Sequence, residues 1–234
     1  MDQYVELRVG DGTAMRAFVA RPGKAGKRPG LLLCQEAYGV NAHIRDVAQR
    51  FAREGYVAIA PELFHRTAPT GFEAPYDKFA LTQPHMQALT TENLEADVRA
   101  AHAWLTQDSG TDPNRIVAVG FCMGGRVSYI AATSIPLKAA VSFYGGGIAP
   151  ALVGRASRAQ APILFFWGAR DTHIPDDQRR AIIDALATAG KSYVAVVFSD
   201  SGHAFFCDAR PSYHRPSATQ AWALTLAFLE NHIE

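Results

Sequence analysis

The sequence is poor in cysteine, and its three cysteines lie far apart, at positions 34, 122 and 207. A number this sparse and odd argues against a disulfide framework and predicts reduced thiols, as in a cytoplasmic protein. The chain also lacks a charge bias, since 23 basic and 22 acidic residues leave a formal net charge of +1. A balance this even favours neither nucleic acid nor an anionic membrane as a partner.

Long hydrophobic runs are absent as well. No apolar stretch approaches the ~20 residues that cross a bilayer, and the first residues, MDQYVELRV, lack the basic segment and apolar core of a signal peptide. We therefore expect a cytoplasmic protein that has no membrane partner. At 234 residues, 48% of them hydrophobic and 19% charged, the chain has the size and composition of a single domain spanning residues 1–234. The oligomeric state, monomer or small homo-oligomer, stays open.

Short apolar segments alternate with helical patterns along the chain. Strands are expected at 4–9, 14–20, 31–34, 56–60, 116–119, 139–143, 163–166 and 194–198, and helices at 41–54, 91–106, 126–132, 176–189 and 217–232. This alternation predicts an α/β fold with a mostly parallel central sheet, helices on both faces and an N-terminal hairpin. Residues 62–87, rich in proline, glycine and aromatics, are expected to be irregular, and so long a loop is more often functional.

The most informative segment is GFCMGG at 120–125, between an apolar run and a helix-compatible run. This is the layout of a nucleophile elbow, Gly-x-Ser-x-Gly, with Cys122 in place of serine. The chain must turn from strand to helix within a few residues, and glycines at 120 and 124 would avoid the clashes that larger residues cause. The turn would place the sulfur at a helix N-terminus, where unpaired N–H groups favour a thiolate.

A cysteine nucleophile needs a base to take its proton and an acid to orient that base. Asp171 follows an expected strand and the turn at Gly168, and His203 follows the next strand in a Gly-His loop. The chain order of nucleophile, acid and base suits this topology, and the carboxyl ends of the strands would bring all three to one sheet edge. Taken singly, Cys122 could be a small buried residue and Asp171 a helix cap, but the order of the three favours a catalytic triad.

Two alternatives stay open. Cys122, His203 and Asp171 are residue types that bind zinc, although no C-x-x-C or H-x-x-x-H spacing supports a metal site. The same fold could also serve a non-catalytic or redox-sensing protein that uses Cys122 as a reversible thiol. The favoured interpretation, an enzyme that transfers acyl groups, requires neither a metal nor a cofactor.

Further motifs extend the pattern over nearly the whole chain: QE at 35–36, SFYG at 142–145, WG at 167–168, GHAF at 202–205 and RPSY at 210–213. With these motifs the chain resembles the dienelactone hydrolase family, a branch of the α/β-hydrolases that has a cysteine nucleophile. The resemblance implies Cys122 as nucleophile, Asp171 as orienting acid and His203 as base. It also implies that Glu36 hydrogen-bonds the resting thiol and keeps it inactive until substrate arrives.

The resemblance further implies an oxyanion hole formed by the backbone N–H groups of Ala37 and Met123. The expected reaction is cleavage of a small-molecule ester or lactone through a thioester intermediate, without a cofactor. Tyr144 and Tyr38 are candidates for the substrate pocket, although tyrosines in such loops are often packing residues. The chain departs from the family in its arginines: it has none between positions 66 and 99, and the first after the Gly-His loop is at 210. The natural substrate therefore stays open.

Overall fold

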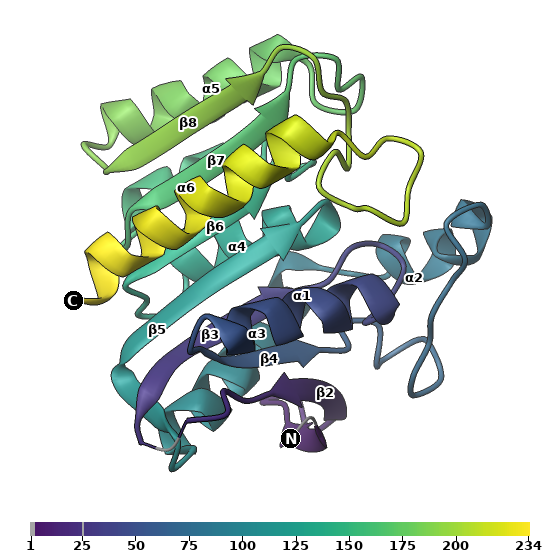
Figure 1. Cartoon of the computed structure of the whole chain (residues 1–234). Coiled ribbons are helices and arrows are strands. Elements are labelled where there is room, and N and C mark those ends of the chain that lie inside the picture. Colours follow the sequence, from purple (N-terminus) through teal and green to yellow (C-terminus); the bar gives the residue numbers. More distant parts are fainter. Residues whose placement is uncertain (1–2, 25) are drawn as a thin grey trace. The chain divides into compact units, whose positions relative to one another are not determined.

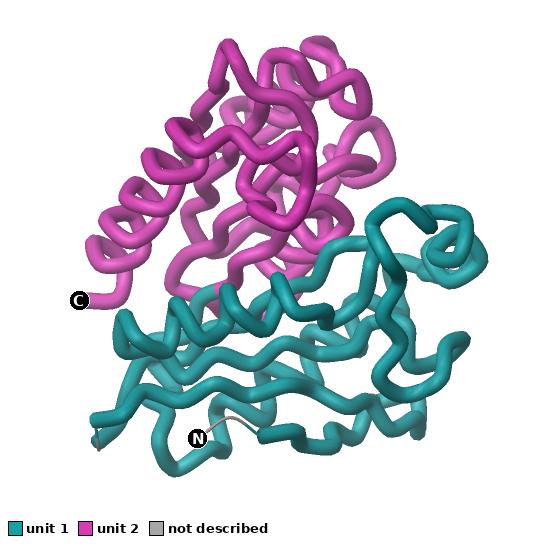
Figure 2. Tube along the Cα trace, turned by 45° about the vertical axis from the view of Figure 1, so that its right-hand side comes forward, with its two compact units in different colours: residues 1–117 teal, residues 118–234 magenta. Residues whose placement is uncertain are grey.

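The computed structural model describes residues 3–24 and 26–234. The chain divides into two compact units, unit 1 (Met1–Val117) and unit 2 (Ala118–Glu234), which Figure 2 shows in different colours. The division falls within strand β5 (Thr111–Phe121). A single domain over residues 1–234 stays a prediction. No helix in the described ranges combines the length and apolar character needed to span a membrane.

Unit 1 is built on a mixed set of strands. Strands β1 (Gln3–Arg8) and β2 (Ala14–Ala20) form the predicted N-terminal hairpin. Strand β2 also pairs antiparallel with β4 (Val57–Pro61), and β4 pairs parallel with β3 (Arg28–Cys34). The strand order within this unit is β1-β2-β4-β3, followed by the first part of β5.

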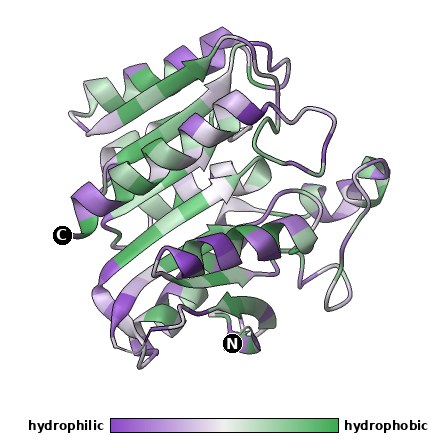
Figure 3. Ribbon diagram, in the orientation of Figure 1, coloured by the Kyte–Doolittle hydropathy of each residue, from purple (hydrophilic) through white to green (hydrophobic). Residues whose placement is uncertain are grey.

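Two long helices cover the strands of unit 1. Helix α1 (Ala42–Arg53) is capped by Asn41, whose side-chain oxygen accepts a hydrogen bond from the N–H of Ile44. Helix α1 packs on β2, β3 and β4, and helix α3 (Thr91–Gln107) packs on β1, β3 and β4. The two helices lie on opposite faces of the strands (Figure 1). Much of the visible side of α1 is hydrophilic (Figure 3), because its apolar residues point to the core.

The segment 62–87 is less irregular than the sequence predicts. It contains a short 3₁₀ helix, η1 (Phe79–Leu81), and a five-residue helix, α2 (Gln83–Gln87). Pro84 lies in the first turn of α2, where a missing N–H breaks no intrahelical bond. The prediction of a wholly irregular segment was wrong because these helices have no buried residue and therefore no apolar periodicity to signal them.

Unit 2 is a parallel α/β layer. Its strand order is β5, β6 (Ala139–Phe143), β7 (Ile163–Gly168) and β8 (Tyr193–Phe198), and β6, β7 and β8 are parallel. Helix α6 (Arg215–Ile233) packs on β6 and β7, α4 (Met123–Ala132) on β6, and α5 (Asp176–Thr188) on β8 and on the 3₁₀ helix η2 (Val153–Arg158). Helix α6 covers one face, and α4 and α5 cover the other (Figure 1). The prediction of parallel strands with helices on both faces is confirmed.

Candidate active site

The turn between β5 and α4 consists of one residue, Cys122. Its backbone has φ 55° and ψ −117°, a conformation that costs a side-chain-bearing residue on the order of 1–3 kcal/mol. The N–H of Cys122 donates to the carbonyl of Phe143 at 3.0 Å, and its own carbonyl accepts from the N–H of Gly125 at 2.9 Å. Hydrogen bonds on both sides therefore hold the strained turn that the elbow pattern predicts.

A pair of glycines lets α4 approach the turn that follows β6. A Cβ atom on Gly125 would lie 2.6 Å from the Phe143 carbonyl oxygen and 2.8 Å from Cα of Gly145. A Cβ atom on Gly145 would likewise lie 2.7 Å from the carbonyl carbon of Gly125. Ser142 adds a hydrogen bond from its hydroxyl to the Gly125 carbonyl at 2.8 Å. The close approach of Gly125 to Gly145 was not predicted from the sequence. The steric role predicted for Gly120 and Gly124 stays a prediction.

Three sequence-predicted residues meet in unit 2. His203 Nε2 lies 3.1 Å from Cys122 Sγ, and His203 Nδ1 lies 2.8 Å from Asp171 Oδ2. The other carboxylate oxygen of Asp171 accepts the N–H of His173 at 2.8 Å, and the Asp171 residue is buried. An imidazole between a thiol and a buried carboxylate is the arrangement of a base that its acid orients.

Burial and polar contacts act in opposite directions on the pKa values of His203 and Asp171. Burial acts to lower the pKa of His203, but the hydrogen bonds and charges of Asp171 and Cys122 outweigh it and raise that pKa from 6.5 to about 10. Burial acts to raise the pKa of Asp171, but the hydrogen bond and charge of His203, with the N–H of His173, hold it below its ordinary value. The site therefore favours a charged imidazolium beside a carboxylate at neutral pH.

The same trio is poorly arranged for a metal ion. Metal ligands converge on one point, whereas His203 faces Asp171 with one ring nitrogen and Cys122 with the other. A single ion cannot take the place of both contacts without turning the imidazole. The geometry favours proton transfer between Cys122 and His203, with Asp171 orienting the ring, over coordination of a metal by the three residues.

The loops that carry the acid and the base lie directly against each other. The N–H of Arg170 donates to the carbonyl of Ser201 at 2.9 Å, and the N–H of Ala169 donates to the carbonyl of Phe198 at 2.8 Å. Gly168 makes this approach possible, because a Cβ atom at that position would lie 2.2 Å from the Ser201 carbonyl oxygen. The turn before Asp171 therefore requires glycine at position 168, because a side chain there would collide with the backbone of Ser201.

A hydrogen-bonded cluster ties the histidine loop to the start of α6. The Ser201 hydroxyl donates to Ser217 Oγ at 2.8 Å, and His214 Nδ1 lies 3.2 Å from Ser201 Oγ and 2.9 Å from Ser217 Oγ. The N–H of His214 also donates to the carbonyl of Phe205 at 2.9 Å. Sequence reasoning missed this cluster, because isolated serines and histidines carry no recognisable spacing.

Aromatic rings surround the imidazole of His203. The ring centroid of Tyr144 lies 5.1 Å from that of His203, and the ring of His173 meets His203 edge to face at 5.0 Å. Among the described residues, the non-glycine positions with positive φ are Cys122, Tyr144 and Ala204, all in unit 2. Strained backbone of this kind clusters at functional sites. Tyr144 is fully buried, and its role in binding substrate stays a prediction.

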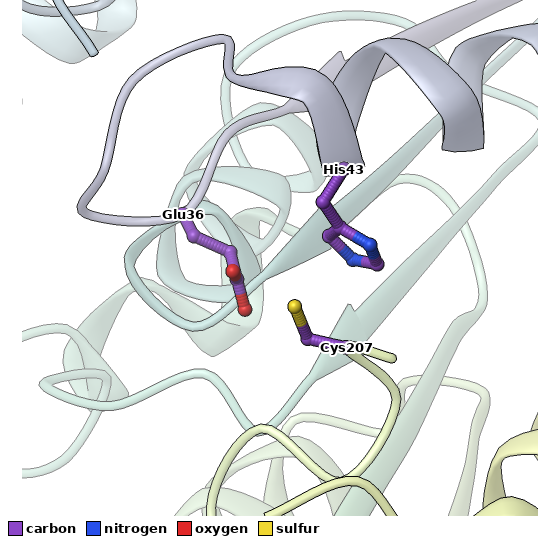
Figure 4. A group of neighbouring side chains, drawn as sticks. All are labelled: Glu36, His43 and Cys207. Atoms are coloured by element: carbon purple, nitrogen blue, oxygen red, sulfur yellow. The ribbon is translucent and has the colours of Figure 1, made fainter. Parts of the chain in front are cut away.

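The remaining predicted residues belong to unit 1. Glu36 and Ala37 are both buried in the segment that follows β3, and the carbonyl of Glu36 accepts a hydrogen bond from the Gln35 amide at 3.1 Å. The carboxylate of Glu36 and the ring of His43 have atoms within 4.8 Å of one another. Figure 4 draws these two side chains together with Cys207 of unit 2. The contact of Glu36 with the thiol and the role of Ala37 as an oxyanion donor stay predictions.

Tyr38 has a packing role in unit 1. It is buried with Ala37 and Ala74 in a small apolar cluster, and its ring meets that of Tyr76 edge to face at 4.8 Å. The hydroxyl of Tyr76 in turn accepts a hydrogen bond from the side chain of Asn41 at 3.0 Å. The segment 62–87 is thereby fastened to the loop after β3, and a contact of Tyr38 with substrate stays a prediction.

Comparisons of sequence and structure relate the chain to known proteins. The Dienelactone hydrolase family model matches residues 15–233. The chain is 36% identical over 231 residues to the "Putative carboxymethylenebutenolidase" of Escherichia coli, covering 94% of this chain and 84% of that protein. It is 35% identical over 214 residues to a Synechocystis protein of the same name, covering 88% and 87%. The crystal structure of a "Putative Dienelactone Hydrolase" from Klebsiella pneumoniae superposes with a TM-score of 0.88 at 34% identity, covering 98% of this chain and 99% of that one.

Proposed function

Because this chain belongs to the dienelactone hydrolase family and is a hydrolase of the α/β-hydrolase fold, we propose that it cleaves an ester or lactone through a Cys122–His203–Asp171 triad. The observation that carries the proposal is the position of His203, 3.1 Å from Cys122 Sγ and 2.8 Å from Asp171 Oδ2. A base in reach of both a nucleophile and an orienting acid is what nucleophilic catalysis requires.

In the active form the proton resides on His203 and Cys122 is a thiolate. The raised pKa of His203, about 10, supports this pairing at neutral pH. The sulfur attacks the carbonyl carbon, so that a C–S bond forms and the carbonyl electrons move to oxygen. When the tetrahedral adduct collapses, the C–O bond to the leaving group breaks and His203 gives that oxygen its proton. A thioester on Cys122 results.

The second half of the reaction regenerates the enzyme. His203, now neutral, takes a proton from water, and the hydroxide attacks the thioester carbon. The C–S bond breaks, the thiolate leaves, and the protonated His203 again faces it. Asp171 takes no proton in either half; it holds the Nδ1–H so that Nε2 faces the sulfur, and it stabilises the imidazolium.

Two backbone N–H groups are proposed to bind the oxyanion. Met123 is the first residue of α4, where a backbone N–H has no acceptor within the helix. The second donor is the N–H of Ala37, in the segment after β3. Fixed donors of this kind are worth about 3 kcal/mol each in other hydrolases.

Glu36 is proposed to restrain the thiol before substrate binds. A buried carboxylate that accepts the S–H hydrogen bond disfavours the thiolate, because a second negative charge nearby would be repelled. Displacement of Glu36 by substrate would then shift the Cys122–His203 pair further from its thiol form toward the imidazolium–thiolate form. The complete burial of the Glu36 side chain supports this proposal, since a carboxylate shielded from water acts strongly on its surroundings.

The test is the hydrolysis of dienelactone and of short p-nitrophenyl esters by the wild type and by Cys122→Ala. We expect the variant to lose activity by roughly a thousandfold or more while remaining folded, as in other hydrolases that lose their nucleophile. Cys34→Ala is the matched control, because it removes a buried thiol from β3 outside the triad. Mass spectrometry of quenched wild-type enzyme should find an acyl group on Cys122. Unchanged turnover by Cys122→Ala would contradict the proposed triad.

A further inference from the structure

Strand β8 is the last strand of unit 2, and one of its two edges is open. It pairs with β7 along one edge, and no strand in the described part of the chain pairs with the other. The carbonyl of Ser192, just before the strand, accepts the N–H of Ile163 at 3.2 Å. The carbonyl of Phe198, at its end, accepts the N–H of Ala169 at 2.8 Å. Residues 192 and 198 therefore direct their backbone groups toward β7.

The backbone groups on the open edge follow from this pattern. Alternate residues of a strand direct their N–H and C=O groups to opposite edges. Because positions 192 and 198 face β7, the N–H and C=O groups of Tyr193, Ala195 and Val197 face away from it. A row of such groups is a ready template for a further strand.

The side chains along this open edge are apolar. Val194 is 45% exposed and Val197 is 50% exposed, and Ala195 between them is exposed as well. Figure 3 shows β8 largely in the hydrophobic colours. Proteins usually protect an edge strand with charged residues, with proline or with a covering segment. The sequence of β8, YVAVVF, contains neither a charge nor a proline.

Strand β1, the terminal strand of unit 1, is protected in the usual way. It carries Glu6 and Arg8, both exposed. The guanidinium of Arg16 also lies over the exposed ring of Tyr4, 4.2 Å from its centroid. Because the chain places charge on one terminal strand and leaves the other apolar, the open edge of β8 has the character of an interface.

We propose that β8 pairs antiparallel with β8 of a second copy of this chain, about a two-fold axis at Ala195. In this register Ala195 of one copy lies opposite Ala195 of the other, and Tyr193 lies opposite Val197, so that the outward N–H and C=O groups exchange hydrogen bonds. The small side chain at the axis lets the strands approach. An aromatic ring opposite a β-branched side chain is a favourable cross-strand pair. On the other face Val194 would lie opposite Val196.

The charges at the ends of β8 favour a second copy in this orientation. Lys191 precedes the strand, and Asp200 follows it with an exposed carboxylate that also pairs with Arg170 at 2.9 Å. Antiparallel pairing brings the start of one strand beside the end of the other, so Lys191 would lie near Asp200 of the second copy. Parallel pairing would instead bring like charges together. The antiparallel pairing occupies the open edge of both copies, so a closed dimer results, and it requires neither substrate nor the proposed hydrolysis.

Sedimentation equilibrium of the full chain between about 1 and 200 µM tests the pairing. We expect a reversible dimer with a Kd of roughly micromolar order, since one strand pair is smaller than a typical stable interface. Val197→Lys should raise this Kd by roughly tenfold or more, because it introduces the charge that protected edge strands carry. Ala195→Pro should do the same and leave the monomer folded, because the N–H that it removes faces the open edge. Circular dichroism verifies the fold of both variants.

Tyr4→Lys is the matched control, because it places the same charge at a similarly exposed position of the other terminal strand. It should leave the Kd unchanged. A wild type that stays monomeric over the whole range, or that assembles beyond two chains, would overturn the proposal. Equal effects of Tyr4→Lys and Val197→Lys would overturn it as well.

Disulfide cross-linking tests the register. The background is Cys122→Ala, in which the remaining thiols, Cys34 and Cys207, are buried. Ala195→Cys should form a covalent dimer under mild oxidation, because opposite residues of this kind have Cα atoms about 5.5 Å apart. Val194→Cys is the control, since the two copies of that position would lie roughly 8 Å apart, too far for a disulfide. Equal yields would overturn the register, whereas selective cross-linking at 195 would support it even if no ester were hydrolysed.

Discussion

Gly168 and Ser201 are packed so closely that a Cβ atom on Gly168 would lie 2.2 Å from the Ser201 carbonyl oxygen. That carbonyl already accepts the N–H of Arg170, the residue before Asp171. The contact therefore fixes the distance between the loop that carries the acid and the loop that carries the base. A larger residue at position 168 would have to separate them, although neither Gly168 nor Ser201 touches the sulfur in the proposed mechanism.

Gly168→Ala is predicted to lower both stability and activity. Overpacking against backbone typically costs about 1–3 kcal/mol, and separation of the two loops would lengthen the 2.8 Å bond between Asp171 and His203. We expect the free energy of unfolding in urea to fall by that amount and kcat to fall by roughly tenfold or more. Gly154→Ala is the control, because a Cβ atom there meets nothing within 4 Å. Equal behaviour of the two variants would contradict the steric argument.

Asp171→Asn is predicted to remove most of the activity while keeping the shape of the site. The amide can offer an N–H to His203 Nδ1, which would place the imidazole proton on Nε2, facing the sulfur. The same change in serine hydrolases costs about 10⁴ in kcat. The pKa of His203 should also fall, because the carboxylate that raises it is gone. Measurement of kcat/KM against pH tests both effects, and a loss below about tenfold would argue against the role of Asp171.

The sequence predicted the arrangement of unit 2 well because its strands are continuous apolar runs. Residues in β6 and β7 are buried throughout, so hydrophobicity marks these strands plainly. Strand β5 was predicted as four residues but spans eleven, since its first half, around Asp112 and Arg115, is polar and partly exposed. Helix α4 begins three residues before the predicted start, at Met123, because two glycines in its first turn hide the helical pattern.

The Cys122, Asp171 and His203 trio in unit 2 was predictable because the residues of a triad follow a recognisable order along the chain. A glycine-flanked nucleophile comes first, then Asp171, then His203. The contacts that hold those residues were not predictable in the same way. Gly125 against Gly145 and Gly168 against Ser201 are approaches between distant segments, and a single sequence does not say which glycine meets which partner. The Ser201–His214–Ser217 cluster was missed for the same reason.

Ser217→Ala is predicted to loosen the histidine loop. Loss of the Ser217 hydroxyl removes the acceptor of Ser201 Oγ and a partner of His214 Nδ1, so that only the 3.2 Å contact between Ser201 and His214 remains, and such a loss typically costs about 1–3 kcal/mol. We expect kcat to fall more than KM changes, because the loop positions the base and not the substrate. Ser212→Ala, at an exposed position before α6, is the control and should leave both unchanged. A Ser217→Ala enzyme with wild-type kcat would show that the loop needs no such anchor.

Glu36→Gln is predicted to change the reactivity of the cysteine. If the carboxylate restrains the resting thiol, the neutral amide should let the thiolate form more readily and speed alkylation by iodoacetamide at pH 7. Peptide mapping must assign the label to Cys122, since Cys34 and Cys207 are buried and should react slowly. Glu62→Gln is the control, as that carboxylate pairs with Arg16 in unit 1. Identical alkylation rates in the wild type and Glu36→Gln would remove Glu36 from the mechanism.

The stability of the protein is predicted to fall as the pH rises through the alkaline range. The pKa of His203 is about 10 in the folded protein against 6.5 ordinarily, so between these values the folded state holds a proton that the unfolded chain has released. The stabilisation from His203 is therefore complete below about pH 6.5 and is lost progressively up to about pH 10.

Urea denaturation at a series of pH values measures this decline, and His203→Gln supplies the reference because it has no titrating ring. The difference in unfolding free energy between the wild type and His203→Gln should shrink between about pH 6.5 and pH 10. Asp171 works in the opposite sense: its lowered pKa adds stability above 3.8 that is lost as the pH falls further. A difference in unfolding free energy between the wild type and His203→Gln that stayed constant across the alkaline range would mean that His203 is neutral in the resting enzyme. The imidazolium–thiolate pair would then have to form only after substrate binds.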